Sequence, residues 1–208
     1  MKTLVVSGIN LFEGGPLSVL KDCLSFLNKY EFSSNYKIVA LVHKKEIFDC
    51  EKLSNIEFHE FPYARKNYIF RLFYEFIYFN KLSKELKVDF WLSLHDISPF
   101  VGKIPQAVYC HNPSIFNTVN LKDFFIQPKL FFFSLFYKYL YKINIHKNKF
   151  VVVQQHWIKN EFQIIFKLDK NKILVAPPEL PIISDKYILR YNNIVNSKKL
   201  FFFPTYPR

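Results

Sequence analysis

The chain has 208 residues, of which 50% are hydrophobic and 22% are charged, and this composition excludes an intrinsically disordered protein. Its three cysteines (Cys23, Cys50 and Cys110) stand too far apart for a disulfide framework or a C-x-x-C metal site, so a reducing cytosol is the natural compartment. The net charge is +12, but only four of the 29 basic residues are Arg, which disfavours a nucleic-acid-binding protein because planar Arg is the preferred reader of bases.

Short runs rich in β-branched residues alternate with amphipathic stretches along the chain. Strands are expected at residues 3–9, 36–42, 55–60, 88–94, 105–110, 149–155 and 172–176, and helices at about 16–30, 66–87, 121–146 and 156–167. Continuous apolar strands are typical of a sheet that is buried on both faces. We therefore expect an α/β fold, a Rossmann-like parallel sheet with helices on both faces, in which ligands bind at the carboxyl ends of the strands.

The alternation of strands and helices stops after Ala176-Pro177-Pro178. Residues 1–180 are expected to form the Rossmann-like domain, and residues 181–208 a connection with a short helix at 185–197 and a new apolar strand at 200–203. A strand of this kind predicts the start of a second domain. We therefore expect the chain to be a fragment of a longer protein. The alternative is a natural protein of this length.

Targeting and membrane-spanning segments are not expected. The apolar run at 3–9 is too short for a signal peptide, and the most apolar stretch, 130–137, lies between Lys129 and Lys138, far short of the roughly 20 residues that a bilayer requires. We expect a cytoplasmic protein.

The first strand leads through Asn10 to Glu13-Gly14-Gly15-Pro16, and an amphipathic helix follows. Glycines permit close backbone approach, and Pro suits the first helical position, so the free N–H groups of this helix are a candidate anion site. The sequence matches neither G-x-G-x-x-G nor a Walker A loop. A plain tight turn is the alternative.

Histidines follow two other strands, His95 in SLHDISP and His111 in YCHNPSIF. Imidazoles at the carboxyl edge of a sheet can bind a ligand or move a proton near pH 7, although either can also be a structural loop residue. No third ligand stands at a usual metal spacing, and Cys110, which precedes His111, is expected in the core.

Polar residues also end the strand before the last helix, in Gln154-Gln155-His156-Trp157. These side chains are expected at the same edge of the sheet. They either contribute to a ligand site or only accept hydrogen bonds from the free N–H groups at the start of the helix.

Residues 121–149 combine many aromatic rings with lysines. Such a pattern is typical of a helix that binds an anionic membrane surface, and also of a core helix whose lysines reach the solvent. The residues expected at a membrane surface are Lys129, Phe132, Phe133, Lys138 and Lys142.

Together these motifs resemble the N-terminal domain of GT-B-fold glycosyltransferases of family 4, the group 1 type, over essentially the whole chain. The resemblance rests on the Gly14-Gly15 loop, the YCHNPS segment around His111, FVVVQQHWIKNEF at 150–162, ILVAPPELP at 173–181 and the terminal FFFPTYPR. No single element among these is specific, but their order and spacing are.

The resemblance implies a retaining hexosyltransferase that moves a sugar from a nucleotide-sugar to an acceptor hydroxyl in polysaccharide or lipid-linked glycan synthesis. It implies that Asn10, Gly14 and Gly15 face the donor diphosphate, and that His111 is the catalytic residue near the donor sugar. The acceptor-side cleft would comprise His95, Asp96, Asn112, Gln155 and His156. The nucleotide-sugar is a substrate, and neither a metal nor another cofactor is expected.

The family's nucleotide-binding domain, with its E-x7-E element, would follow Arg208, so this chain alone is not expected to complete the reaction. A glycan or lipid-linked acceptor and a peripheral contact at the inner face of the cell membrane are the expected partners. The alternative is a non-catalytic basic α/β module that binds a membrane surface or an anionic polymer.

Overall fold

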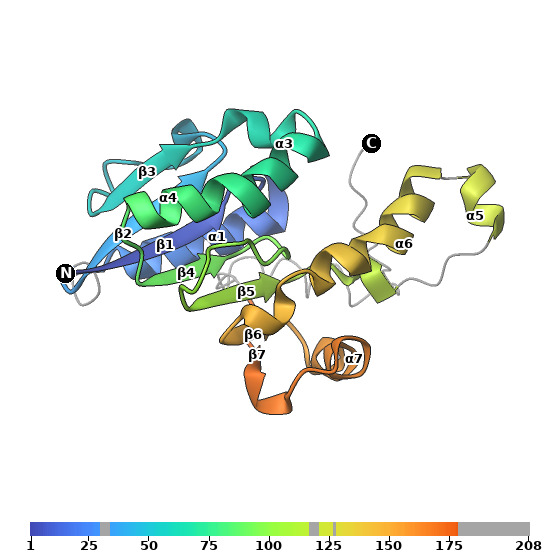
Figure 1. The fold of residues 1–208 in the computed structure, drawn as a ribbon. Helices are drawn as coiled ribbons and strands as arrows, with labels where there is room; N and C mark the ends of the chain where they lie inside the picture. The colour runs from blue at the N-terminus through green and yellow to red at the C-terminus, as the bar shows by residue number, and fades with distance from the viewer. Residues whose placement is uncertain (30–33, 117–120, 127, 179–208) are drawn as a thin grey trace, which may run out of the picture. The chain divides into compact units, whose positions relative to one another are not determined.

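A computed structural model describes residues 1–29, 34–116, 121–126 and 128–178 of the chain, which divides into two units, 1–177 and 178–208. Within the described residues, seven parallel strands form one sheet in the order β3-β2-β1-β4-β5-β6-β7 (Figure 1). The strands are β1 (Lys2–Gly8), β2 (Tyr36–Val42), β3 (Ile56–Glu60), β4 (Phe90–Ser93), β5 (Gln106–Cys110), β6 (Phe150–Val153) and β7 (Ile173–Val175).

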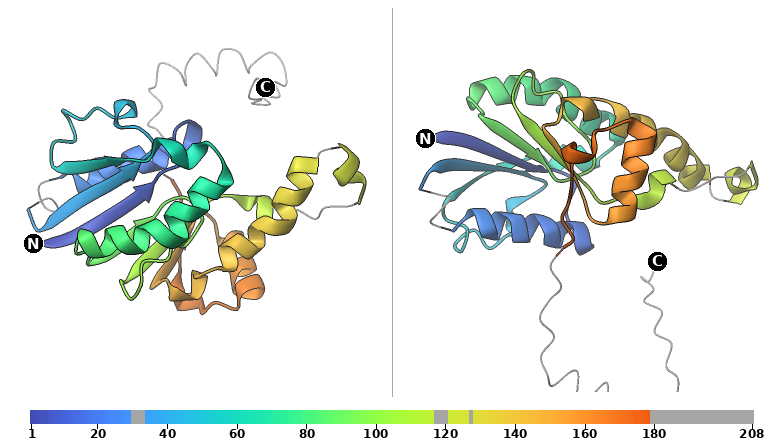
Figure 2. Two further views of the ribbon diagram at one scale, coloured as in Figure 1. Left: turned by 45° about the horizontal axis from the view of Figure 1, so that its top comes forward. Right: turned by 90° about the horizontal axis from the view of Figure 1, so that it is seen from below.

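Helices cover both faces of the sheet (Figure 2). They are α1 (Gly14–Leu27), α3 (Tyr68–Phe73), α4 (Phe79–Glu85), α5 (Leu121–Ile126), α6 (Pro128–Lys142) and α7 (His156–Phe166). A π-helical turn, η3 (Tyr74–Tyr78), joins α3 to α4. Short 3₁₀ turns lie at η1 (Lys45–Ile47), η2 (Pro62–Arg65), η4 (Pro113–Phe116), η5 (Ile145–Lys147) and η6 (Lys170–Lys172).

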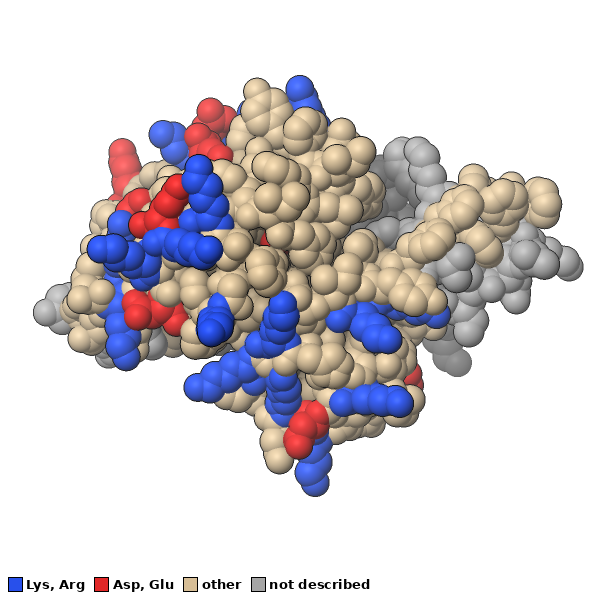
Figure 3. Space-filling model, viewed as in Figure 1, with Lys and Arg blue, Asp and Glu red and all other residues tan. Residues whose placement is uncertain are grey.

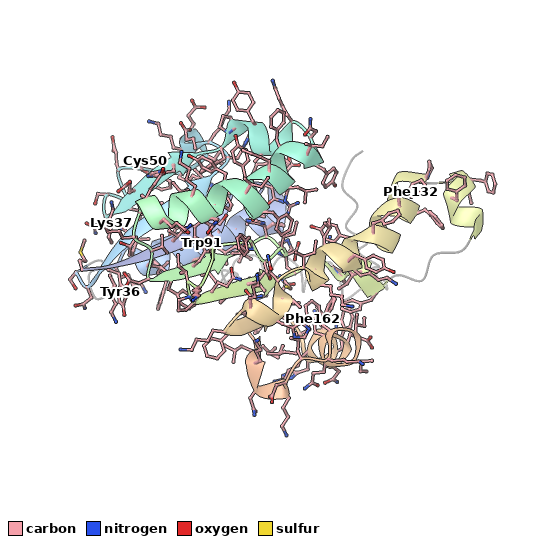
Figure 4. The ribbon with its side chains drawn as sticks, viewed as in Figure 1. Tyr36, Lys37, Cys50, Trp91, Phe132 and Phe162 are labelled. Carbon is pink, nitrogen blue, oxygen red and sulfur yellow. The ribbon has the colours of Figure 1, made fainter. Side chains whose placement is uncertain are left out.

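The central strands are buried on both faces because successive side chains of a strand point to opposite sides. Val6 packs in the cluster that contains Leu20 of α1, whereas Val5 packs in the cluster that contains Phe79 and Trp91. The rings of Phe79 and Trp91 lie 5.0 Å apart, and Figure 4 shows Trp91 beneath α4. The expected sheet with helices on both faces is confirmed.

A third cluster holds α6 and α7 against β5, β6 and β7. The rings of Tyr141 from α6 and Phe162 from α7 lie 5.8 Å apart and pack with Val108 and Val151 of the strands. Figure 4 shows Phe162 at α7, while Phe132 lies on the part of α6 that extends away from the sheet. Among the described side chains of α6, the rings that pack in this core come from its C-terminal part.

The expected strands are all present, but two expected helices are divided. The π turn interrupts the helix expected at 66–87, and the amide of Phe100 donates to the Glu75 carbonyl in that turn at 2.8 Å. The stretch expected as one helix at 121–146 forms α5 and α6, because Pro128 lacks an N–H group and suits a helix start. The helix and strand expected at 185–197 and 200–203 lie outside the described residues.

Among the described residues no helix combines the length and the apolar character needed to cross a membrane.

Two glycines near α1 provide a matched test of packing. A Cβ atom at Gly8 would lie 2.6 Å from Cδ2 of the fully buried Leu20, whereas a Cβ at Gly15 would meet no atom within 4 Å. Gly8→Ala is expected to lower the free energy of unfolding by about 1–3 kcal/mol through overpacking, while Gly15→Ala changes it little. Urea unfolding followed by circular dichroism measures both values, and equal stability of the two variants would contradict this packing.

Candidate functional site

The candidate site lies at the carboxyl edge of the sheet, where four loops begin. Because the strands are parallel, the loops after β1, β4, β5 and β6 all leave the sheet at this edge. They contribute Asn10, His95, His111 and Gln155.

His95 has no exposed surface, so in this structure it cannot touch a ligand as an acceptor-cleft residue would. Its Nε2 lies 3.0 Å from Oγ of Ser7 and 3.4 Å from Oγ of Ser93. The Arg71 guanidinium donates to the His95 carbonyl at 2.9 Å and lies 3.4 Å from Nδ1. Because a guanidinium only donates, Nδ1 accepts and the neutral ring has its proton on Nε2. His95 therefore positions the loop after β4.

Glu75 lies beside this histidine and is also fully buried, with its Oε1 3.2 Å from Nε2 of His95 but without hydrogen-bond geometry. Burial raises the pKa of Glu75 to about 8, although the nearby Arg71 opposes the increase. Burial and the Arg71 charge hold the pKa of His95 well below its ordinary value. At pH 7 the two groups are therefore a protonated carboxyl and a neutral imidazole, and their contact is not an ion pair.

Asp96 connects the loops after β4 and β5. It has a φ angle of 71° in the left-handed region, which Asp tolerates better than most residues. Its Oδ1 accepts from the amides of His111 at 2.8 Å and Asn112 at 3.2 Å. The expectation that Asp96 lines the acceptor cleft does not match its position, because the residue is only 6% exposed and its carboxylate is used inside the protein. Cys110 is buried, as expected.

His111 keeps access to the solvent. Its side chain is 17% exposed, and its Nδ1 lies 3.5 Å from the Asp96 carboxylate. Asn112 beside it is half-buried, and its carbonyl accepts from the hydroxyl of Tyr141 at 3.4 Å. Gln155 and His156 are exposed at the start of α7, where the Gln155 side chain accepts from the indole N–H of Trp157.

The loop between β1 and α1 leaves the start of the helix open. Gly14 has a φ angle of 64°, which L side chains rarely adopt, and Glu13 at the N-cap makes no side-chain hydrogen bond to the helix. The first turn contains no acidic residue. Together with the open space beside Gly15, this geometry leaves the first N–H groups of α1 available to an anion.

A cavity of about 480 Å³ lies beside the same loop. It is lined by Asn10, Phe12, Ala64, Arg65, Lys66, Asn67, Tyr68 and Arg71. Its cationic residues and the buried Glu75 were not among the residues predicted from the sequence. One signal was available: Arg71 and Glu75 stand four residues apart in the otherwise apolar run YIFRLFYEFIYF.

The expected membrane surface divides into two parts. Tyr137 and Tyr141 of α6 are buried in the core, whereas Phe132, Lys142 and the rings of α5 are exposed, with Lys138 half-buried. The side chains of Lys129 and Phe133 lie outside the described residues. The C-terminal part of α6 is therefore a core helix, and the membrane contact of the exposed part stays a prediction.

Within the described residues no group of three His, Cys, Asp or Glu side chains is arranged to hold a metal ion.

No protein-family model matches the sequence, and no curated protein matches it. Solved structures do match. The chain is similar to the lipopolysaccharide outer core galactosyltransferase WaaB in its apo form, with a TM-score of 0.54 and 11% identity, over 88% of this chain and 47% of that one. It is also similar to a glycosyltransferase from Rickettsia africae ESF-5, with a TM-score of 0.53 and 13% identity, over 95% of this chain and 50% of that one.

At these identities the likeness shows the fold, which is the Rossmann-like α/β fold of one half of a GT-B enzyme. The chain spans about half the length of the solved structures it matches. The expected fold class is confirmed, and membership of family 4 stays a prediction.

The buried carboxyl of Glu75 makes stability depend on pH. Its pKa rises from 4.5 to about 8 on folding, so between these values the folded protein holds a proton that the unfolded chain releases. Glu75 therefore contributes most stability below pH 4.5, and its contribution falls as the pH rises to about 8, by up to about 1.4 kcal/mol per pH unit. Glu75→Gln is expected to remove this fall, since an amide does not ionise.

Urea unfolding of wild type and Glu75→Gln between about pH 5 and pH 8 measures the difference. His95, whose depressed pKa gives the opposite slope, is present in both proteins. Glu85→Gln on the exposed part of α4 is the control, and its pH profile should follow wild type. Parallel profiles for wild type and Glu75→Gln would contradict the raised pKa.

Proposed function

We propose that this chain is the acceptor-side half of a retaining, nucleotide-sugar-dependent glycosyltransferase of the family 4 type that acts in polysaccharide or lipid-linked glycan synthesis. The observation that supports this most directly is the carboxyl edge of the sheet. There an uncapped helix start and a partly exposed histidine lie on the fold of one half of a glycosyltransferase. The chemistry of that edge matches what sugar transfer from a diphosphate requires.

The leaving group of such a reaction is a nucleoside diphosphate, which departs with the electron pair of the bond to the sugar. The N-terminus of α1 would stabilise this charge through N–H groups that no side chain caps. Gly14 and Gly15 let the phosphate approach the backbone, and Asn10 lies two residues before Phe12 in the same loop. The remaining contacts to the donor would come from a second domain.

His111 is the proposed catalytic residue. The two backbone hydrogen bonds to Asp96 hold its loop in place, and its ring remains partly open to the solvent. From that position it would donate a hydrogen bond to the donor sugar or its phosphate oxygen. Asn112, Gln155 and His156 would contact the acceptor, whereas the buried His95 and Asp96 would act by positioning the loops after β4 and β5.

A peripheral contact with the inner face of the cell membrane is part of the proposal. The exposed rings of α5 and the exposed Phe132 and Phe136 of α6 are large apolar groups beside Lys138 and Lys142. Rings and lysines in this combination bind anionic lipid surfaces. No cofactor is proposed besides the nucleotide-sugar substrate.

The test is an assay of sugar transfer and hydrolysis from a panel of nucleoside diphosphate sugars, using the gene product that contains these residues. His111→Ala and Gly15→Asp are each expected to lower the rate about tenfold or more. The aspartate would place a negative charge where the diphosphate binds, in a position with space for the side chain.

Ser25→Asp is the control, because it adds the same charge at an exposed position near the other end of α1 and should keep the wild-type rate. An unchanged rate in both Gly15→Asp and His111→Ala would move the chemistry away from this edge. A gene product that neither turns over nor binds any nucleotide-sugar would favour the non-catalytic basic module.

A further inference from the structure

We propose that the basic cavity beside the β1–α1 loop binds a phosphate group of the acceptor. This inference rests on the proposed transferase function, because it names the acceptor of that reaction as the molecule that carries the phosphate. The cavity adjoins the proposed diphosphate site, because Asn10 lines it, but no residue of α1 does.

The cavity lining is cationic without any acid. Its charged residues are Arg65, Lys66 and Arg71, and no Asp or Glu is among the residues that line it. Arg65 and Arg71 are the two Arg residues in the described part of the chain, and the other two, at 190 and 208, lie outside it. Arg is the side chain that best matches phosphate geometry.

None of the three forms an ion pair within the described residues, although the Asp96 carboxylate attracts the Arg71 guanidinium. The Arg65 guanidinium lies 3.0 Å from the centre of the Phe12 ring, and Lys66 Nζ lies 4.9 Å from the Tyr63 ring. Both are cation–π contacts, which position a cation and leave its charge in place. The cavity therefore has a positive potential that a bound anion would offset.

Arg71 forms the buried part of the cavity wall and is only 6% exposed. One of its terminal nitrogens donates to the His95 carbonyl, but its Nε has no hydrogen-bond partner among the described residues. The neighbouring Glu75 is protonated at pH 7, and Asp96 already accepts two backbone amides. The Nε–H of Arg71 is therefore an unused hydrogen-bond donor in the cavity wall.

A phosphate fits this wall better than a carboxylate does. A single Arg satisfies the two oxygens of a carboxylate in one plane, whereas the oxygens of a phosphate point in several directions and accept from several donors. Here the guanidinium groups of Arg65 and Arg71 and the ammonium group of Lys66 line one cavity of about 480 Å³. A phosphate monoester or diester would use all three.

The surface next to the cavity favours a lipid as the source of that phosphate. Five large apolar side chains of α3 and η3 are exposed: Tyr68, Ile69, Phe70, Phe73 and Ile77. Figure 3 shows a broad uncharged surface over α3. A lipid headgroup could occupy the cavity while these side chains contact the adjacent acyl chains, whereas a free sugar phosphate would use the cavity alone.

Arg65 and Lys66 are exposed, so Arg65→Gln/Lys66→Gln removes two charges without disturbing the core. Lys81→Gln/Lys84→Gln on α4 is the matched control with the same charge change. Binding of glucose 1-phosphate is measured by calorimetry. Flotation with phosphatidylcholine vesicles, with and without phosphatidic acid, measures binding to a lipid phosphate.

The cavity variant is expected to bind the phosphate probe about tenfold or more weakly than wild type, with the control pair unchanged. Loss in both assays assigns the cavity to a lipid headgroup, and loss with glucose 1-phosphate alone assigns it to a soluble phosphate. Loss in the vesicle assay alone also supports a lipid headgroup. An equal loss in cavity and control variants, or no loss in either assay, overturns the proposal.

Both binding assays are made on this chain without a nucleotide-sugar, so they do not depend on turnover. Phosphate binding that requires Arg65 and Lys66 in a protein without transferase activity would support the cavity and contradict the proposed function. A functional transferase whose phosphate binding does not depend on Arg65 and Lys66 would support the proposed function and contradict the cavity.

Discussion

The contact between Arg71 and the fully buried His95 holds the carboxyl edge of this domain together. It joins helix α3 to the loop after β4, while Ser7 and Ser93 fix the ring of His95 from the ends of β1 and β4. Loss of this hydrogen bond would leave a donor of a buried guanidinium unsatisfied, which costs more than the roughly 1–3 kcal/mol of a neutral buried group. The polar network is therefore as important to this edge as the apolar clusters are to the sheet.

The order of this network explains why His111, and not His95, is suited to contact a substrate. His95 fixes its own loop, the next residue Asp96 binds the amides of the loop after β5, and His111 extends from that loop into partly open space. Rigid support beneath an exposed side chain is the arrangement that catalytic and binding groups require. Arg71 belongs to both the network and the wall of the basic cavity, so the two proposed sites share one foundation.

Sequence patterns predicted the sheet well, because continuous apolar runs such as YKIVALV at β2 leave few alternatives to a buried strand. They predicted which loops meet at the carboxyl edge, since parallel strands impose this. They could not predict that His95 points into the protein and His111 partly outward, because this depends on contacts with Arg71, distant in sequence. The cationic cavity was missed for the same reason, as its residues come from two separate segments.

Hydrogen–deuterium exchange of the gene product with and without a nucleotide-sugar tests the central claim most directly, because it reports which loops a donor contacts. Among the residues of this domain, we predict slower exchange at 10–18 and 109–113, around the open start of α1 and His111. A donor that protects other segments and leaves both of these unchanged would contradict it.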